Sequence, residues 1–518
     1  MNISEILRSR ARAHPDAVAI VDSHRGSRRA TTFRMLNEEA DRGATMLDRS
    51  GVKPRDSVLV FQPMSAELYA ALVAIFRVGA VAMFLDPSAG SDHIERCLQV
   101  IAPAALIASP KAHWLRFRSR ALRKIPRKFA VGGNLLCAVR WPGSETAPPT
   151  DAAAPEAALI TFTSGSTGEP KAAVRTHEFL MAQHRVLEHT LGLTEGAIDM
   201  ATLPVFVLAN LASGVTSVIP DADLRRPGEV DGESISNQIA RERVSSTAAS
   251  PAFLERAVAW CESTGTCIES LRKVFAGGAP VFPPLLDRLR AIAPHADVTS
   301  VYGSTEAEPI CELRADQISA QDLASMREGR GLLAGRQVDE IALRIMKDRW
   351  GRPVGPHTAE TFEQDCVAPR TPGEIVVSGP HVLSGYLGGH GDQETKFRVD
   401  GNVWHRTGDC GYLDDAGRVW MLGRAAARIG DGAGAMYPFS VECALSFLPQ
   451  VRRSAVLSHS GRRVLFVEWR DGAGDERALS EHIVWASIDE IRSCRKIPVD
   501  RRHNAKIDYV ALRRMAEH

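Results

Sequence analysis

The sequence lacks a cysteine framework. Its nine cysteines are scattered along 518 residues and include neither a Cys-x-x-Cys pair nor a Cys/His cluster at the spacing of a zinc site. They lie at positions 97, 137, 261, 267, 311, 366, 410, 443 and 494. We therefore expect reduced thiols, most of them in the core, and no disulfide scaffold.

An excess of charge of either sign is also missing. The chain carries 63 Lys and Arg against 62 Asp and Glu, so its formal net charge is +1. A protein whose main task is to cover nucleic acid or an anionic membrane needs a strong positive field. The balance argues against both classes, and we expect no nucleic-acid partner.

Long apolar runs are absent as well. The N-terminal segment MNISEILRSRARAHPD carries acids and bases from its start and has no apolar stretch of the kind found in signal peptides. The most apolar window, residues 58–87, is interrupted by Pro63, Glu67, Arg77 and Gly79, which is unsuited to a membrane span. It predicts a strand, a helix and a second strand. We expect a cytoplasmic protein.

The sequence does contain the alternation of an α/β protein. A length of 518 residues exceeds what one hydrophobic core usually supports, which predicts two or more domains. Short β-branched runs alternate with amphipathic helical stretches over roughly the first four hundred residues. Strands are predicted at Ser57–Phe61, Ala80–Leu85, Ala158–Phe162, Lys273–Ala276, Val298–Val301 and Glu374–Ser378.

The alternation of predicted strands and helices stops near Arg424. A glycine-rich bridge, RIGDGAGAMYP, follows this residue and leads into a short α+β tail. We therefore predict a large α/β domain with several subdomains over residues 1–424, and a small mobile α+β domain over residues 425–518.

The segment TSGSTGEPK, residues 163–171, allows two interpretations. Glycine and serine make flexible linkers, but the preceding strand holds this segment at a sheet edge and the closing Glu-Pro-Lys stiffens it. Backbone N–H groups near Gly165 and Gly168 can approach an anion, and Lys171 adds positive charge. Hydroxyl donors come from Thr163, Ser164, Ser166 and Thr167. Phosphate binding is favoured, although the Gly-Lys-Ser/Thr of a Walker A motif is absent.

Three further polar groups follow. YGSTE at 302–306 suits base stacking, phosphate contact and a hard cation on Glu306, but a turn with an exposed acid has the same pattern. Asp409 can accept both hydroxyls of a ribose and Arg424 can approach phosphate, although such residues more often form surface ion pairs. Lys506, in the tail, would by itself be an ordinary exposed lysine.

Together and in this order, these motifs resemble the adenylate-forming superfamily of acyl-CoA ligases, luciferases and peptide-synthetase adenylation domains. TSGSTGEPK is similar to its phosphate loop. The other similarities are GGAP at 277–280 and YGSTE at 302–306 to the adenine and magnesium motifs, HRTGD at 405–409 to the ribose motif, GR at 423–424 to the end of the large domain, and NAKI at 504–507 to the C-terminal lysine motif.

The resemblance implies an enzyme that uses ATP and Mg²⁺ to convert a carboxylate into an acyl adenylate, releasing pyrophosphate. Lys506 would bridge the carboxylate and the α-phosphate, Lys171 would help hold the outer phosphates, and Glu306 with Thr167 would bind Mg²⁺. The implied ATP- and AMP-binding residues are Thr163, Ser164, Gly165, Ser166, Thr167, Gly168, Gly277, Gly278, Ala279, Tyr302, Gly303, Ser304, Thr305, Asp409 and Arg424.

Departures from the general pattern point to one branch of this superfamily. The hinge residue Ala426 stands where relatives usually carry Asp or Lys, and Val207 stands where CoA ligases commonly have His. Segments 211–223, 302–310 and 498–507 resemble the β-lactone synthetases of bacterial olefin biosynthesis. In that branch the hydroxyl of a long-chain 3-hydroxy acid attacks its own acyl carbon and expels AMP.

Two alternatives to a β-lactone synthetase stay open. The first is a fatty acyl-CoA or acyl-carrier ligase, whose partner would be CoA or a carrier protein. The second is a noncatalytic ATP-binding relative. The substrate is expected to be a fatty acid or a 3-hydroxy fatty acid, and its chain would occupy a pocket between residues 203–214, residues 250–254 and the strand that ends at Gly277. Phe206, Leu208 and Leu211 either line this pocket or belong to the core.

One basic segment is not explained by adenylation. Residues 111–128 hold eight Lys or Arg and no acid, with Trp114 and Phe117 among them. Such a segment is either a solvated helix and loop or a docking face for an acidic partner, such as a pathway enzyme, or for a lipid surface.

Overall fold

The computed structural model describes residues 2–24, 26–86, 90–133, 135, 137–144, 156–164, 169–431, 434–470, 472, 474–500 and 506–517. The chain forms two compact units. Unit 1 comprises Met1–Asp221 with Leu383–Gln393, and unit 2 comprises Ala222–Val382 with Glu394–His518. Within the described ranges, no helix is long and apolar enough to cross a membrane.

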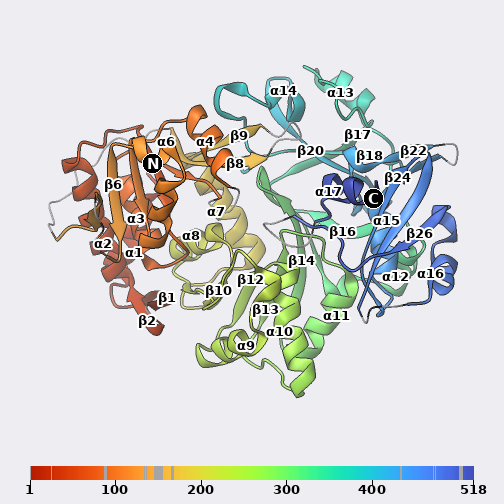
Figure 1. Ribbon diagram of the computed structural model, residues 1–518, viewed down its shortest axis with the longest axis horizontal. Helices are drawn as coiled ribbons and strands as arrows, with labels where there is room; N and C mark the ends of the chain where they lie inside the picture. Colours follow the sequence, from red (N-terminus) through yellow and green to blue (C-terminus); the bar gives the residue numbers. More distant parts are fainter. Residues whose placement is uncertain are drawn as a thin grey trace. The chain divides into compact units, whose positions relative to one another are not determined.

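Unit 1 contains a largely parallel sheet with the strand order β7-β6-β5-β3-β4-β8-β9 (Figure 1). Neighbouring strands are parallel from β7 to β8, and β9 is antiparallel to β8. The strands are β3 (Ser57–Phe61), β4 (Val81–Phe84), β5 (Ala105–Ala108), β6 (Arg127–Val131), β7 (Val139–Trp141), β8 (Ala157–Ser164) and β9 (Pro170–Thr176). Helices α2 (Phe33–Arg49) and α4 (Ser91–Val100) also belong to this unit.

Helix α3 (Ala66–Arg77) connects β3 to β4 and is buried along its whole length. Its two charged residues are paired, because Arg29 donates to Glu67 over 2.8 Å and Arg77 donates to Asp41 over 2.7 Å. Burial alone would raise the pKa of Glu67, but the hydrogen bonds from Arg29 outweigh it and lower the pKa to about 2. The strand, helix and strand predicted for this window are therefore confirmed.

A second group of strands in unit 1 has the order β2-β1-β11-β10. These strands are β1 (Val18–His24), β2 (Ser27–Thr32), β10 (Ile198–Ala201) and β11 (Thr216–Val218). Helix α8 (Pro204–Ser213) packs on β10 and β11, and α1 (Ser4–Ala13) and α7 (His177–Leu191) pack against α8.

In unit 2 the strand order is β12-β13-β14-β15-β16-β21-β20-β18-β17 (Figure 1). Strands β12 to β14 are parallel, and the pairs from β14 onward are antiparallel. The strands are β12 (Ser246–Ala249), β13 (Lys273–Gly277), β14 (Asp297–Ser304), β15 (Ala307–Arg314), β16 (Leu332–Gln337), β17 (Ala342–Met346), β18 (Gly373–Ser378), β20 (Asn402–Leu413) and β21 (Val419–Arg424). Helices α9 (Gly232–Arg241), α10 (Pro251–Thr264) and α11 (Pro283–Ile292) accompany the parallel part.

The C-terminal part of unit 2 has its own small sheet in the order β24-β25-β26. Its strands are β24 (Val451–His459), β25 (Arg462–Trp469) and β26 (Glu490–Ser493), and its helices are α15 (Pro438–Leu445), α16 (Glu476–His482) and α17 (Tyr509–Ala516). Separate apolar clusters contain Leu465 and Phe466, neighbours on β25 whose side chains point to opposite faces of the sheet.

The predicted fold class, a large α/β part with a small C-terminal α+β part, is confirmed. All six predicted strands are present: Ser57–Phe61 coincides with β3, and the bounds of the others lie within one to three residues of those of β4, β8, β13, β14 and β18. The domain boundary at residue 424 stays a prediction.

Candidate active site

The predicted adenine motifs lie at the carboxyl ends of parallel strands in unit 2. Gly277 ends β13 and pairs with Val301 of β14. Gly278 and Ala279 follow β13 directly, while Tyr302–Ser304 form the end of β14. Carboxyl ends of parallel strands share one sheet edge, where α/β proteins commonly bind ligands. The fold therefore brings together two motifs that are separated along the chain.

Asp409 is held by two other predicted residues. The Tyr302 hydroxyl donates to one carboxylate oxygen over 2.8 Å, and the Arg424 guanidinium donates to the other over 3.0 Å. Strand register explains the second contact, since Asp409 of β20 pairs with Arg424 of β21. Burial, reinforced by the negative charge of Asp409, raises the pKa of Tyr302 well above its ordinary value, so the hydroxyl stays protonated. Each oxygen of Asp409 keeps a further lone pair that can accept a sugar hydroxyl.

The backbone before Asp409 is fixed by residues that sequence reasoning missed. Arg406 and Glu374 form an ion pair with distances of 2.6 and 3.0 Å, and both side chains are almost fully buried. The Arg406 guanidinium lies 5.5 Å from the centre of the Trp350 ring. Gly408, at a φ of +71°, lies against this ring, and a Cβ there would be only 2.8 Å from it. The sole sequence signal was the arginine inside HRTGD.

Thr305 and Glu306 form the turn between β14 and β15. After the larger contribution from Asp409, the charge of Glu306 also helps to raise the pKa of Arg424. Ser304 has a buried hydroxyl with no hydrogen-bond partner among the described residues, which suits a donor reserved for a ligand. A single carboxylate such as Glu306 is compatible with Mg²⁺, which usually takes its other ligands from water and phosphates.

Lys171 lies in β9 of unit 1, and its side chain is buried. Its Nζ is 5.8 Å from the centre of the Tyr386 ring. Gly391, at a φ of +100°, makes room for the lysine, because a Cβ there would be 2.5 Å from the Lys171 Cδ. Ala173 forms an isolated bridge with Tyr386, so Leu383–Gln393 lies along β9. The lysine thus belongs to a covered strand and not to the loop itself.

The phosphate-loop residues Gly165, Ser166, Thr167 and Gly168 lie outside the described residues. The backbones of Thr163 and Ser164 belong to β8, where they pair with Lys171 and Pro170 of β9. The segment therefore connects two antiparallel strands. Its role as a phosphate cradle, and that of Thr167 as a metal ligand, stay predictions.

Lys506 is exposed in the C-terminal part of unit 2. Its backbone N–H donates to the Asp500 carboxylate over 2.9 Å, and its carbonyl accepts from the Asp500 N–H over 2.8 Å. Val499 and Ile507 form a bridge beside these bonds. The backbone of the lysine is therefore well fixed, whereas the approach of its ammonium group to ATP stays a prediction.

A second contact near Lys506 was not foreseen. The Tyr509 hydroxyl, three residues further on, donates to Glu442 of α15 over 2.7 Å. Burial raises the pKa of Glu442 to about 7, against the opposing effect of this hydrogen bond. The contact ties the start of α17 to α15.

The proposed acyl-pocket residues lie in α8 of unit 1. Phe206 and Leu211 are buried and Leu208 is half-buried. Both interpretations, pocket lining and plain core, are compatible with this burial. The hinge residue Ala426 lies in a short 3-10 helix, Ala425–Ala427, and is exposed.

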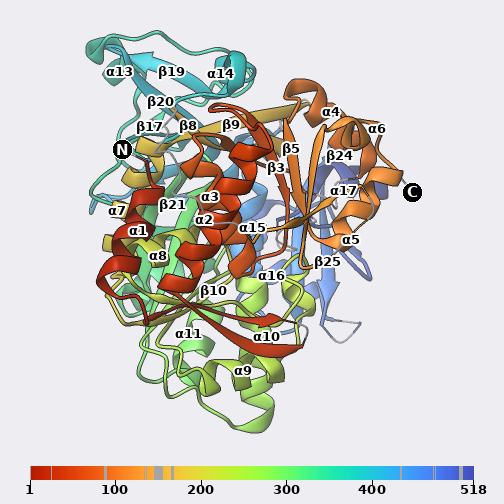
Figure 2. The same ribbon diagram turned by 90° about the vertical axis from the view of Figure 1, so that its left-hand side faces the viewer.

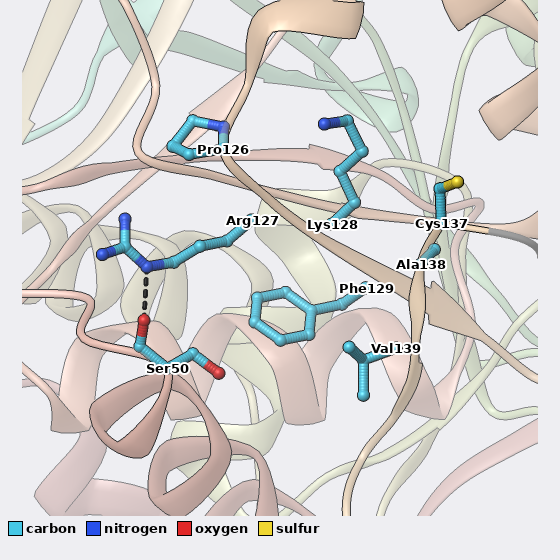
Figure 3. Close-up of a pocket in the computed structure, with 8 residues that line it drawn as sticks. All are labelled: Ser50, Pro126, Arg127, Lys128, Phe129, Cys137, Ala138 and Val139. Carbon is cyan, nitrogen blue, oxygen red and sulfur yellow. Dashed lines mark hydrogen bonds between the residues drawn. The ribbon is translucent and has the colours of Figure 1, made fainter.

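A surface hollow of about 480 Å³ lies elsewhere in unit 1 and contains none of the predicted site residues (Figure 3). Arg127 turns towards Ser50 and donates to its backbone oxygen. Lys128 donates to the carbonyl of Ile125. The lining of the hollow is Ser50, Pro126, Arg127, Lys128, Phe129, Cys137, Ala138 and Val139.

Comparison with known proteins identifies the family. The profile described as AMP-binding enzyme matches residues 7–387. The chain belongs to this family. It is accordingly an adenylate-forming acid ligase, and enzymes of this type use ATP.

Individual relatives of this AMP-binding enzyme cover almost the whole chain. It is 31% identical to the olefin beta-lactone synthetase of Stenotrophomonas maltophilia, over 98% of this chain and 96% of the relative. The protein of the same name from Xanthomonas campestris pv. campestris is also 31% identical, with the same coverage. The 2-succinylbenzoate–CoA ligase of Geobacillus kaustophilus is 28% identical, over 91% of this chain and 89% of the relative.

Solved structures share the fold of this AMP-binding enzyme. The amide bond synthetase McbA from Marinactinospora thermotolerans superposes with a TM-score of 0.82 at 22% identity, covering 99% of both chains. ATP-bound MatB from Rhodopseudomonas palustris has a TM-score of 0.78 at 20% identity and covers 100% of this chain and 99% of its own.

Proposed function

We propose that this enzyme adenylates a long-chain 3-hydroxy fatty acid and then closes the product to a β-lactone. The observation that carries the proposal is the near-complete coverage, at 31% identity, of two olefin beta-lactone synthetases. In the first step a carboxylate oxygen attacks the α-phosphorus of ATP and pyrophosphate leaves. In the second, the 3-hydroxyl oxygen attacks the acyl carbon, AMP leaves, and the hydroxyl proton passes to solvent or a base.

The described residues support the adenylation half of this proposal. Asp409 would accept the ribose hydroxyls, while Tyr302 and Arg424 hold the carboxylate in place. Glu306 would bind Mg²⁺, which neutralises charge on the phosphates when bound. Lys506 would bridge the two anions that must meet, and Lys171 would help to hold the outer phosphates.

Two residues support the proposal that the acyl group is not transferred to a thiol. Val207 stands where CoA ligases commonly have His, and Ala426 stands where relatives that rotate the small domain usually carry Asp or Lys. A hydroxyl on the same acyl chain reacts intramolecularly, and well-oriented groups of this kind reach effective molarities of about 10⁵ M or more. The second step therefore needs neither CoA nor a site for it.

A fatty acyl-CoA ligase is the second candidate. The 28% identity to 2-succinylbenzoate–CoA ligases, over 91% of this chain in one case, favours it. A noncatalytic ATP-binding relative is less compatible with the sequence, because it has no use for the combination of Lys171, Glu306, Asp409, Arg424 and Lys506.

Mass spectrometry separates these functions. Enzyme, ATP and Mg²⁺ are incubated with a long-chain 3-hydroxy acid without CoA, and a product at the mass of the acid minus water is expected. The matched acid without a hydroxyl should stop at the acyl adenylate. Turnover only after CoA is added would establish the ligase instead, and no pyrophosphate from any acid would establish the noncatalytic relative.

A further inference from the structure

The basic segment of unit 1 carries two exposed aromatic rings. It forms the connection between β5 and β6, built from α5 (Pro110–His113), a 3-10 helix (Trp114–Phe117) and α6 (Arg120–Lys124). Figure 2 shows α4, α5 and α6 grouped beside β5. Trp114 is 67% exposed and Phe117 is 69% exposed. Their rings lie 5.4 Å apart, so they form one apolar surface patch.

Charge surrounds these rings. The exposed cations of the segment are Lys111, Arg118, Arg120, Arg123 and Lys124. Within the described ranges, none of these five side chains makes a hydrogen bond or an ion pair, although the charge of Arg123 helps to lower the pKa of the neighbouring Glu95. By contrast, Arg116 is buried and donates to the carbonyls of His113 and Cys137, and Arg127 and Lys128 are held by backbone oxygens. We call the two rings and the five exposed cations the basic aromatic patch.

The patch is supported from below. Ser109 and Ser119 accept hydrogen bonds from Ala112 and Leu122 and so cap α5 and α6. Leu122 is fully buried in an apolar cluster of the unit. Glu95 of α4 accepts from Ser119 and from the Ala121 N–H, so this neighbouring acid is engaged in holding α6. The exposure of the rings is therefore a property of a well-packed segment.

We propose that the basic aromatic patch binds the surface of an anionic phospholipid bilayer. Phospholipid headgroups would neutralise the five cations, while Trp114 and Phe117 enter the boundary between headgroups and acyl chains. Tryptophan and phenylalanine on a Lys/Arg-rich segment suit this boundary. Clusters of four to eight Lys or Arg suit anionic lipid surfaces, at about 1 kcal/mol for each cation, or about fivefold in partitioning.

The pairing of rings with cations favours lipid over an acidic protein. An acidic protein surface would satisfy the charges, whereas a bilayer presents negative charge and a continuous apolar layer within a few ångströms of each other, which suits both the cations and the two exposed rings. The inference does not depend on the proposed function, although a long-chain acid would itself partition into the same bilayer.

Vesicle co-sedimentation tests the patch with the full chain. Wild-type protein should bind vesicles of equal parts phosphatidylcholine and phosphatidylglycerol, bind phosphatidylcholine alone at least tenfold more weakly, and be released by salt. Arg118→Gln/Arg120→Gln should weaken partitioning about 25-fold. Trp114→Ala/Phe117→Ala should weaken it about tenfold or more. As a matched control, Val484→Ala/Arg477→Gln removes equally exposed residues elsewhere and should bind like wild type.

Bromine-labelled lipids test whether the ring enters the bilayer. They should quench part of the wild-type tryptophan fluorescence, and Trp114→Phe should lose that part while still binding vesicles. Pyrophosphate release with a water-soluble short-chain acid should be unchanged in all variants, which verifies folding and separates this result from a failure of the proposed function. No binding to anionic vesicles would overturn the proposal. Loss of binding in the arginine variant alone, with Trp114→Ala/Phe117→Ala unaffected, would overturn the proposed entry of the two rings into the bilayer.

Discussion

The buried Arg406–Glu374 pair makes a quantitative prediction. Replacing Glu374 with leucine leaves the Arg406 guanidinium buried, charged and without its hydrogen bonds of 2.6 and 3.0 Å to the carboxylate, while its bonds to the backbone carbonyls of Arg352 and Glu394 remain. Breaking a buried pair from one side costs about 3–5 kcal/mol, because arginine does not lose its proton in proteins. We therefore expect Glu374→Leu to lower the free energy of unfolding by this amount.

The reverse change should cost less. In Arg406→Met the stranded group is a carboxyl, whose pKa burial already raises even in the presence of Arg406. It can take up a proton, so the loss should shrink as the pH falls. The double variant Glu374→Leu/Arg406→Met leaves no uncompensated charge and should recover most of the stability.

Urea unfolding of the four proteins, followed by tryptophan fluorescence, gives the coupling energy between the two residues. AMP binding by calorimetry reports whether Asp409, three residues beyond Arg406, has moved. We expect the double variant to recover stability but to bind AMP more weakly than wild type, since Arg406 also lies against Trp350. Additive losses in the double variant would refute the reasoning.

Three other predictions concern the site. The folded-state pKa of Glu442 is raised from 4.5 to about 7. Its contribution to stability is therefore fully present below pH 4.5 and is lost as the pH rises through 7, and the loss is at most about 3 kcal/mol. In denaturation experiments, the stability of Glu442→Gln should depend less on pH than that of the wild type. Gly408→Ala places a Cβ 2.8 Å from the Trp350 ring and should weaken AMP binding about tenfold or more. The control is Gly417→Ala, which has a similar φ of +72° but whose Cβ would lie 3.7 Å from the nearest atom, on Arg336. It should lower only the stability, by about 1–2 kcal/mol. Lys506→Ala should slow pyrophosphate release by about 10²-fold or more and leave ATP binding nearly unchanged; wild-type release would contradict the role proposed for this lysine.

Features that local sequence determines were predicted well. Apolar β-branched runs such as Ser57–Phe61 predicted strands because buried parallel strands require them. The family resemblance, and not local sequence, grouped Tyr302, Asp409 and Arg424 in one site. The structure joins these three residues by hydrogen bonds, and their role in nucleotide binding stays a prediction.

Features that depend on distant partners were not predicted. Glu374 lies 32 positions from Arg406, and nothing near either residue shows that the two are a buried pair. No sequence motif pointed to Trp350, whose ring the fold places against Gly408. Lys171 was expected at the end of a loop. The segment that buries its side chain, Leu383–Gln393, is more than two hundred residues further along the chain, so the local sequence did not show that the lysine is buried.

The position of the segment that buries Lys171 has a consequence for folding during synthesis. Leu383–Gln393 belongs to unit 1, although the rest of this unit ends at Asp221. A nascent chain that has reached residue 221 still lacks the Tyr386 strand contact with Ala173 and the backbone that packs on Lys171. Unit 1 can therefore complete its packing only after residues 222–382, which belong to unit 2, have been synthesised. An N-terminal fragment that stops before residue 383 would expose the lysine.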